Sequence, residues 1–445
     1  MPDGRCPDAR DAVRRAAAIL IAFAILAGAP ALLPAADRVP RPEFLSDYQA
    51  PSIQNPLPRA EWLQSLDVLV LGLALAAAGW LSVRARSREG IFLLGVFSIG
   101  YFGFFRKGCI CPIGSIQNVA LALSDPTYAL PLSAVAFFVL PLVAALLTGR
   151  AFCGGVCPFG ALQEAVIVRP LRLPRWLSVP LGVLPAAYLS LAVLFAATGG
   201  EFVICRFDPF VSFFRLGGRA PILALGACFL ALGTVVARPY CRFLCPYGLI
   251  LGWMSHLALR HPTISPDSCV QCRLCEDACP VGAIRPAFSP PAGLPPAGER
   301  RAFALSILAT PVLVGLAAWL GFLASPAIAQ AHPTVRLAEQ VRREDAGETS
   351  ATTLESVTFR SQTATTDELF RAAADVRLRF ARGTPVAAGF TMLVLVLTVL
   401  GSFVRRRTEE YSMDRAACVS CGRCFSHCPR EHLRRRPAGQ TGSAA

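Results

Sequence analysis

The chain has 445 residues, of which 54% are hydrophobic and 16% are charged, and its mean hydropathy is +0.50. Soluble proteins carry about 25% charged residues, so this composition excludes an ordinary soluble domain and indicates a polytopic membrane protein. The net charge is +14, but the arginines gather in loops between apolar segments. This is the positive-inside pattern of membrane proteins, and it argues against a nucleic-acid partner.

Eight apolar segments are expected to cross the membrane. They lie at about 16–34, 62–83, 90–105, 128–147, 176–197, 220–237, 302–324 and 385–404. Arg14 and Arg15 precede the first segment, so we expect a cytoplasmic N-terminus, and eight crossings return the C-terminus to the same side. Ala27–Ala29 has the form of a signal-peptidase site, but Pro30 follows it directly, which favours an uncleaved anchor.

The expected fold is an all-α polytopic membrane protein with a small cytoplasmic α+β module of the bacterial ferredoxin type. Residues 1–260 form the transmembrane core, 261–300 the first half of the module, 301–404 a transmembrane hairpin and 405–445 the second half of the module. A polar outer loop within the hairpin is predicted to hold two short amphipathic helices, Val335–Arg343 and Asp367–Ala381.

Two copies of the motif C-x2-C-x2-C-x3-C-P flank this hairpin, namely Cys269, Cys272, Cys275 and Cys279, and then Cys418, Cys421, Cys424 and Cys428. In two-cluster ferredoxins the first three cysteines of such a motif bind one [4Fe-4S] cluster and the fourth binds the other. We therefore predict one cluster on Cys269, Cys272, Cys275 and Cys428, and a second on Cys418, Cys421, Cys424 and Cys279. This exchange needs both motifs on one face of the membrane, which two crossings between them allow. Structural zinc is the alternative, but zinc ribbons usually separate two C-x2-C knuckles by a longer loop.

A second repeat, R-x-[FY]-C-x3-C-P-[FY]-G, occurs at residues 150–160 and 238–248. Its cysteines are Cys153, Cys157, Cys241 and Cys245. Residues four apart share one face of a helical turn, so we expect the two pairs to converge on an additional metal ion or cluster at the cytoplasmic rim. The alternative is that these small cysteines only pack helix ends, which the duplicated flanking residues disfavour.

A third, partial copy of this repeat contains Cys109 and Cys111, and its C-P-I-G-S-I-Q sequence parallels C-P-F-G-A-L-Q at 157–163. On the expected topology both cysteines lie on the outer side, together with Cys205 of the sequence C-R-F-D-P-F. These three thiols could bind a metal ion or exchange a disulfide, and a disulfide without a redox role is equally compatible. If the segment at 90–105 is only re-entrant, Cys109 and Cys111 face inside instead.

The order of these motifs resembles the membrane polyferredoxins of the NapH/NosR/CcoG type, over about residues 105–285 and in the C-terminal motif. The resemblance implies two cytoplasmic [4Fe-4S] clusters in a protein of the bacterial inner membrane. It also implies electron transfer between cytoplasmic or quinone pools and periplasmic redox enzymes. About 25 residues separate the first two apolar segments, which is too few for the flavin domain of the NosR type, so no flavin is expected.

The function favoured by these features is electron relay from a cytoplasmic or quinol donor to a periplasmic partner, as the electron-transfer component of a quinol dehydrogenase. A quinone is therefore a candidate partner, and His256 and His261 are candidates to take up quinol protons. The alternative is an assembly or regulatory factor that reduces a metal such as copper, or senses redox state, while a respiratory metalloenzyme matures. The direction of electron flow does not follow from sequence, because cluster potentials depend on hydrogen bonds and solvation.

Overall fold

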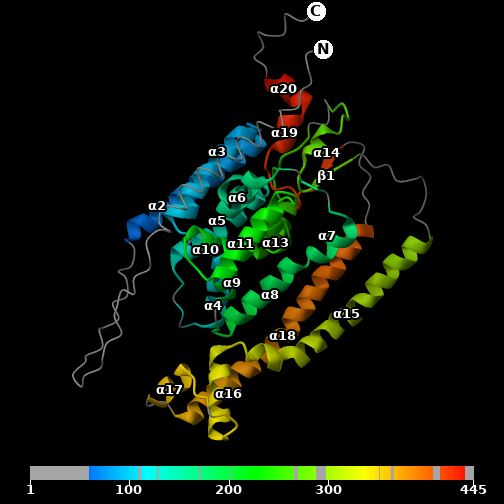
Figure 1. Ribbon diagram of the computed structural model, residues 1–445. Helices are drawn as coiled ribbons and strands as arrows, with labels where there is room; N and C mark the ends of the chain where they lie inside the picture. Colours follow the sequence, from blue (N-terminus) through cyan, green and yellow to red (C-terminus); the bar gives the residue numbers. More distant parts are fainter. Residues whose placement is uncertain are drawn as a thin grey trace, which may run out of the picture. The chain divides into compact units, whose positions relative to one another are not determined.

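Figure 1 shows the computed structural model of the chain, which is mostly helical. The structure describes residues 60–108, 112–126, 128, 130–168, 170–171, 173–200, 202–264, 269–286, 297–349, 351–361, 365–403 and 411–435. Two units group separately, 1–70 and 71–445, and every contact discussed below lies within the second unit. The predicted membrane segment at 16–34 lies outside the described residues, as do Cys109 and Cys111.

Five helical spans of the described part are long and apolar enough to cross a membrane. They are α2 (Glu61–Val83), α3 with the π-helical η1 (Arg88–Ser98 and Ile99–Phe105), α7 with α8 (Arg175–Leu181 and Leu184–Ala197), α15 (Ala297–Ala329) and α18 (Thr366–Phe403). Two shorter apolar helices, α5 (Leu132–Thr148) and α11 (Ala220–Gly233), lie where further crossings are predicted. A helix satisfies its backbone hydrogen bonds internally, which lipid requires. Seven of the eight predicted segments are therefore apolar helices, while the number of crossings stays a prediction.

Helices α15 and α18 form the predicted hairpin and lie side by side (Figure 1). Small residues set their closest approach, since a Cβ added to Gly321 would lie 2.8 Å from the Cβ of Ala388 and 2.8 Å from the carbonyl oxygen of Thr384. In lipid, burial of apolar surface gives little drive for association, so close contacts of this kind hold helices together.

A small helical subdomain lies between the two long helices in sequence. It consists of α16 (Pro333–Asp345), α17 (Leu354–Ser361) and the first part of α18. Its buried core contains Val335, Ala338, Val341, Phe359, Leu369 and Ala373. The predicted helix Val335–Arg343 is confirmed within α16. The helix predicted at Asp367–Ala381 is confirmed as the first turns of α18, but it is not separate from the membrane segment, because Gly383 and Pro385 do not interrupt α18.

Short helices between the long ones carry the cysteines of the core. Five of them begin with proline: α4 (Pro112–Ser124), α6 (Pro158–Val166), α10 (Pro209–Phe214), α12 (Pro239–Phe243) and α13 (Pro246–His256). Proline fits this place because the first N–H groups of a helix have no intrahelical partner. It also disfavours helical geometry in the residue before it, which therefore stands at the helix N-terminus.

The two ferredoxin-type motifs come together in one small module. Its elements are α14 (Leu274–Ala278), β1 (Ile284–Arg285), β2 (Ser412–Met413), α19 (Arg423–His427) and α20 (Pro429–Arg435). Strands β1 and β2 pair antiparallel, with Ile284 opposite Met413. The pairing joins residues on either side of the hairpin, so both motifs lie at the same end of it, as the predicted exchange of cysteines requires.

Candidate cysteine sites

Two cavities in the module are each lined by cysteines from both motifs. The first ferredoxin site is the cavity lined by Cys269, Cys272, Cys275 and Cys428, which Cys424 also borders. The second ferredoxin site is the cavity lined by Cys279, Cys418, Cys421 and Cys424. Each site thus contains the fourth cysteine of the other motif, as expected from the spacing. That these cysteines ligate clusters stays a prediction.

The two loops bend in the same way at corresponding positions. Gln271 and Ser420, each directly before the second cysteine of its motif, have positive φ angles of 52° and 53°. Arg273 and Gly422, each directly after that cysteine, have φ angles of 63° and 76°. Left-handed backbone is strained for residues other than glycine and is kept where the surrounding structure requires it. Here it wraps each loop around its cavity before α14 or α19 begins.

Burial is the main influence on the thiol pKa values of the second ferredoxin site. It raises the pKa of the Cys418 thiol to about 12. The backbone N–H of Ser420 donates to this sulfur at 3.5 Å and lowers the same pKa by a smaller amount. The N–H of Ala283 donates to the sulfur of Cys279 at 3.2 Å. A thiol that coordinates a metal loses its proton outright, and such N–H groups then stabilise the thiolate.

A zinc ion and an iron–sulfur cluster place different demands on the four cysteines of a ferredoxin site. Across the described residues, no three His, Cys, Asp or Glu side chains stand close enough together to share one metal ion. A tetrahedral zinc site needs four donors around one point, whereas a cubane presents a separate iron to each thiolate. The assignment of iron–sulfur clusters to these cavities stays a prediction.

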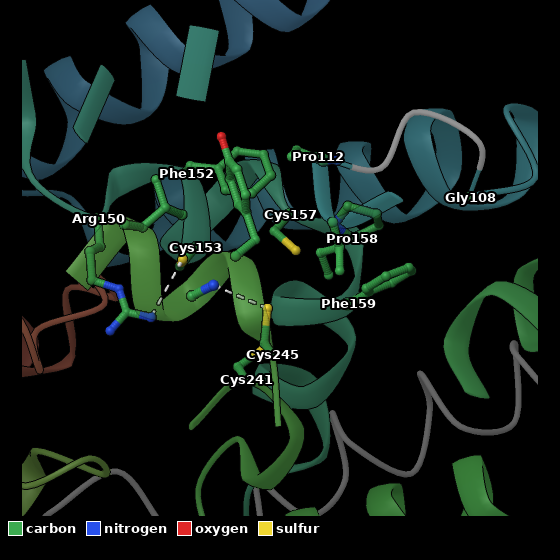
Figure 2. Close-up of a pocket in the computed structure, with 14 residues that line it drawn as sticks. Gly108, Pro112, Arg150, Phe152, Cys153, Cys157, Pro158, Phe159, Cys241 and Cys245 are labelled. Atoms are coloured by element: carbon green, nitrogen blue, oxygen red, sulfur yellow. Dashed lines mark hydrogen bonds between the residues drawn. The ribbon is translucent and has the colours of Figure 1, made fainter. Parts of the chain in front are cut away.

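The four cysteines of the C-x3-C-P repeat line one cavity, here called the core site (Figure 2). Cys153 lies in the π-helical η2 (Phe152–Val156) and Cys241 lies in α12. The prediction that each pair shares one helical turn is wrong for the second cysteine, because Cys157 and Cys245 are extended N-caps of α6 and α13. The proline after each of them forces this geometry. The pairs nevertheless converge, as predicted.

Each copy of the repeat places its arginine against the other copy. A Cβ added to Gly160 would lie 3.4 Å from Nη1 of Arg238, and one added to Gly248 would lie 3.2 Å from Nη2 of Arg150. Arg238 Nη1 also donates to the carbonyl oxygen of Cys153 at 2.5 Å. The arginine and the glycine of the motif are therefore neighbours across the two copies, while a Cβ at Gly160 would clash with the carbonyl oxygen of Cys153, 2.7 Å away.

A glutamine of the same repeat holds the segment that carries Cys241. Gln163 Oε1 accepts from the backbone N–H of Tyr240 at 3.1 Å, and its Nε2 donates to the sulfur of Cys241 at 3.1 Å. Burial raises the pKa of the Cys241 thiol to about 11, while the positive charge of Arg238 opposes that rise. The core site thus presents both a hydrogen-bond donor and a cation to this sulfur.

The partial third copy has the same glutamine contact. Gln117 Oε1 accepts from the backbone N–H of Ile204 at 3.0 Å, the residue directly before Cys205. In the second C-x3-C-P copy, the residue bound by the glutamine directly precedes Cys241. The exposed Cys205 therefore corresponds in position to Cys241. The outer thiol site itself stays a prediction, since Cys109 and Cys111 lie outside the described residues.

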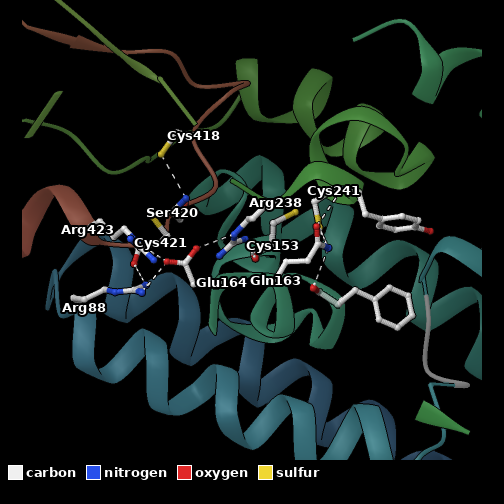
Figure 3. A network of polar contacts seen from close by, with 12 residues as sticks. Arg88, Cys153, Gln163, Glu164, Arg238, Cys241, Cys418, Ser420, Cys421 and Arg423 are labelled. Carbon is white, nitrogen blue, oxygen red and sulfur yellow. Dashed lines mark hydrogen bonds and ion pairs between the residues drawn. The ribbon is translucent and has the colours of Figure 1, made fainter. Parts of the chain in front are cut away.

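A buried carboxylate that the sequence analysis missed joins the core to the module (Figure 3). Glu164 on α6 is 4% exposed, and its Oε1 lies 2.7 Å from Arg88 Nη2 and 2.6 Å from Arg423 Nε. Its Oε2 lies 3.0 Å from Arg238 Nε. Burial alone would raise the pKa of Glu164, but the three arginines lower it to about 2. The carboxylate is therefore ionised at neutral pH. These four residues are called the Glu164 junction below.

The second ferredoxin site packs directly on the core site. A Cβ added to Gly154, the residue after Cys153, would lie 2.8 Å from the carbonyl oxygens of both Val419 and Ser420. Such a close approach of two backbones requires a residue without a side chain. The η2 segment that carries Cys153 and the loop that carries Cys418 and Cys421 therefore touch with no side chain between them.

The two histidines predicted to handle quinol protons lie outside the three cysteine cavities. His256 is the exposed last residue of α13, and its carbonyl oxygen accepts from Arg415 at 3.4 Å. Burial lowers the pKa of His261, and the positive charge of Arg415 lowers it further. A role for either histidine in quinol chemistry stays a prediction.

Comparisons with known proteins agree with this arrangement of cysteines. Two sequence profiles of 4Fe-4S binding domains match the chain, one over residues 130–178 and 216–265 and the other over 262–285. The methylamine utilization ferredoxin-type protein MauN of Methylorubrum extorquens is 30% identical over 228 residues, which cover 46% of this chain and 76% of MauN. The chain belongs to the NapH/NosR-type 4Fe-4S membrane proteins.

Other relatives of this NapH/NosR-type protein match over a smaller share of their length. Protein NirI of Paracoccus denitrificans is 29% identical over 298 residues, which cover 59% of this chain and 42% of NirI. Regulatory protein NosR of Pseudomonas aeruginosa is 30% identical over 207 residues, which cover 43% of this chain and 29% of NosR. YccM of Escherichia coli is 30% identical over 187 residues, which cover 38% of this chain and 52% of YccM. The chain thus spans about half of these relatives or less, and no solved structure matches it.

Proposed function

We propose that this NapH/NosR-type protein relays single electrons across the bacterial inner membrane. The donor would be a cytoplasmic reductant or a membrane quinol, and the acceptor a redox partner on the periplasmic side. The observation that carries the proposal is the contact at Gly154, which puts the loop of the second ferredoxin site against the core site without an intervening side chain. Adjacent redox sites suit a relay, because the rate of electron transfer falls steeply with distance.

The chain's own residues would hold the redox groups and control their surroundings. The two ferredoxin sites would each hold a [4Fe-4S] cluster, which exchanges one electron at a time when bound. The 4Fe-4S profile over 130–178 and 216–265 also covers all four cysteines of the core site, which supports a further cluster there. Burial of Cys153, Cys157 and Cys245 keeps water away from that site, and the backbone N–H of Gly248 donates to the Cys245 sulfur at 3.3 Å.

The first test is the cofactor content of protein purified without oxygen in mild detergent. Two occupied ferredoxin sites require about eight iron and eight sulfide per chain, and an occupied core site adds about four of each. Cys153→Ser should remove only the added portion. Cys228→Ser is the matched control, since Cys228 is an exposed cysteine on α11 outside the three cavities. Zinc without sulfide would contradict the proposal.

The relay itself can be measured in liposomes that enclose an impermeant oxidised dye. Addition of a quinol, or of dithionite outside, should reduce the dye in vesicles with the wild-type protein and in those with Cys228→Ser. Cys421→Ser should abolish the reduction, because Cys421 belongs to the site next to the core. If fully loaded protein passes no electron while a gene deletion strips a partner enzyme of its metal, the chain is an assembly factor instead.

A further inference from the structure

The Glu164 junction contains more positive charge than negative charge. Arg88, Arg238 and Arg423 surround one carboxylate, which leaves a surplus of two positive charges. Arg238 is 1% exposed, and its buried Nη2 has no hydrogen-bond partner among the described residues. A buried charge without a full set of partners is costly. The surroundings therefore favour further negative charge beside this arginine.

Thiols stand on both sides of the junction, in position to supply that charge. One junction arginine donates to the carbonyl oxygen of Cys421 at 2.7 Å, and another donates to that of Cys153 at 2.5 Å. Burial alone would lower the pKa of Arg238, but Glu164 raises it, and so do the thiolates of Cys421, Cys241 and Cys153. The junction therefore acts on the second ferredoxin site and on the core site together (Figure 3).

The first ferredoxin site has a different electrostatic setting. Its carboxylate, Glu431, lies 3.2 Å from Arg86 Nε and 2.6 Å from Arg434 Nη2, and the Arg434 side chain is 54% exposed. Water and ions screen charges at such exposed positions. Arg86, whose side chain is 12% exposed, is at least as well buried as Arg88, but it and Arg434 together leave a surplus of only one positive charge over Glu431, against two at the Glu164 junction.

We propose that the Glu164 junction raises the reduction potential of the centre held at the second ferredoxin site above that of the first, and so directs electrons toward the core site. This inference rests on the proposed function. One electron enters from a low-potential one-electron reductant, and no bond forms or breaks. Arginine stays protonated throughout, so the junction stabilises the added negative charge without taking up a proton. Iron–sulfur potentials respond to net charge and to solvent exposure in this way.

The test is a dithionite titration of the loaded protein, followed by EPR, in variants that change the charge of one ion pair in opposite senses. Arg423→Gln removes a positive charge and should shift the second centre to lower potential. Glu164→Gln removes the negative charge and should shift it to higher potential. Arg285→Gln is the control, since Arg285 also pairs with an acidic residue of the module but is 67% exposed. Cys272→Ser assigns the signals, because it removes a ligand of the first site only.

Shifts of opposite sign in the second centre, with the first centre unmoved, are the expected result. Shifts of the same sign in Arg423→Gln and Glu164→Gln, equal shifts in both centres, or no shift would overturn the proposal. If Glu164→Gln fails to load iron, Arg88→Gln and Arg423→Gln carry the test, because their side chains are 19% and 21% exposed and tolerate replacement better. Each should lower the potential of the second centre and leave that of the first unmoved. Failure of the relay in liposomes would refute the proposed function, yet the measured order of the two potentials would stand.

Discussion

Replacement of Gly154 by alanine tests the contact between the core site and the second ferredoxin site. The new Cβ would lie 2.8 Å from the carbonyl oxygens of Val419 and Ser420. Carbon and oxygen atoms in such contacts rest at about 3.3–3.6 Å, so the loop must retreat by roughly 0.5–0.8 Å. Overpacking of this kind costs about 1–3 kcal/mol, which is a factor of about 5 to 150 in an equilibrium constant. The loop carries Cys418 and Cys421, so we expect the second site to lose iron before the membrane helices unfold.

The measurement is the loss of cluster absorbance during heating, compared with helix content in the same sample. Gly100→Ala is the matched control, because Gly100 also lies in a π-helical segment and a Cβ there would meet no atom within 4 Å. The control should behave as the wild type does. If Gly154→Ala holds its iron as long as Gly100→Ala, the contact does not constrain the loop and the reasoning fails.

Three further predictions concern other parts of the chain. Cys428→Ser should disturb the EPR signal of the first ferredoxin site and Cys279→Ser that of the second; the opposite assignment would exclude the exchange of fourth cysteines. Gln163→Leu should destabilise the protein by about 1–3 kcal/mol in thermal unfolding, because the buried N–H of Tyr240 loses its acceptor; an unchanged unfolding temperature would contradict this. Val341→Asp buries a charge in the small helical subdomain and should open it to limited proteolysis without loss of iron.

The cysteine spacing predicted which side chains would meet, because short loops leave few ways to surround a cluster. It did not predict the conformation of Cys157 and Cys245, since the helical spacing of i and i+4 says nothing of the break that a following proline imposes. The prediction ended an amphipathic helix at Ala381 and began the membrane segment at about residue 385, whereas α18 runs through Gly383 and Pro385 without a break. In a membrane helix such residues are tolerated more readily.

The Glu164 junction shows why part of the site could not be read from sequence. Glu164 directly follows the C-P-F-G-A-L-Q sequence at 157–163, but its partner Arg423 lies 259 positions away, in the other half of the chain. Nothing in the local pattern around either residue signals an ion pair. The contact exists only because the hairpin returns the second motif to the core, which is a property of the folded chain.

The split of the module by α15 and α18 has a consequence for how the protein is made. Neither ferredoxin site has its four cysteines until both long helices are in place, because Cys279 and Cys428 each complete the site of the other motif. A chain whose hairpin crossed the membrane only once would leave the two motifs on opposite faces and offer only three cysteines to each cluster. We therefore expect retention of iron to report that the two motifs have reached the same face of the membrane.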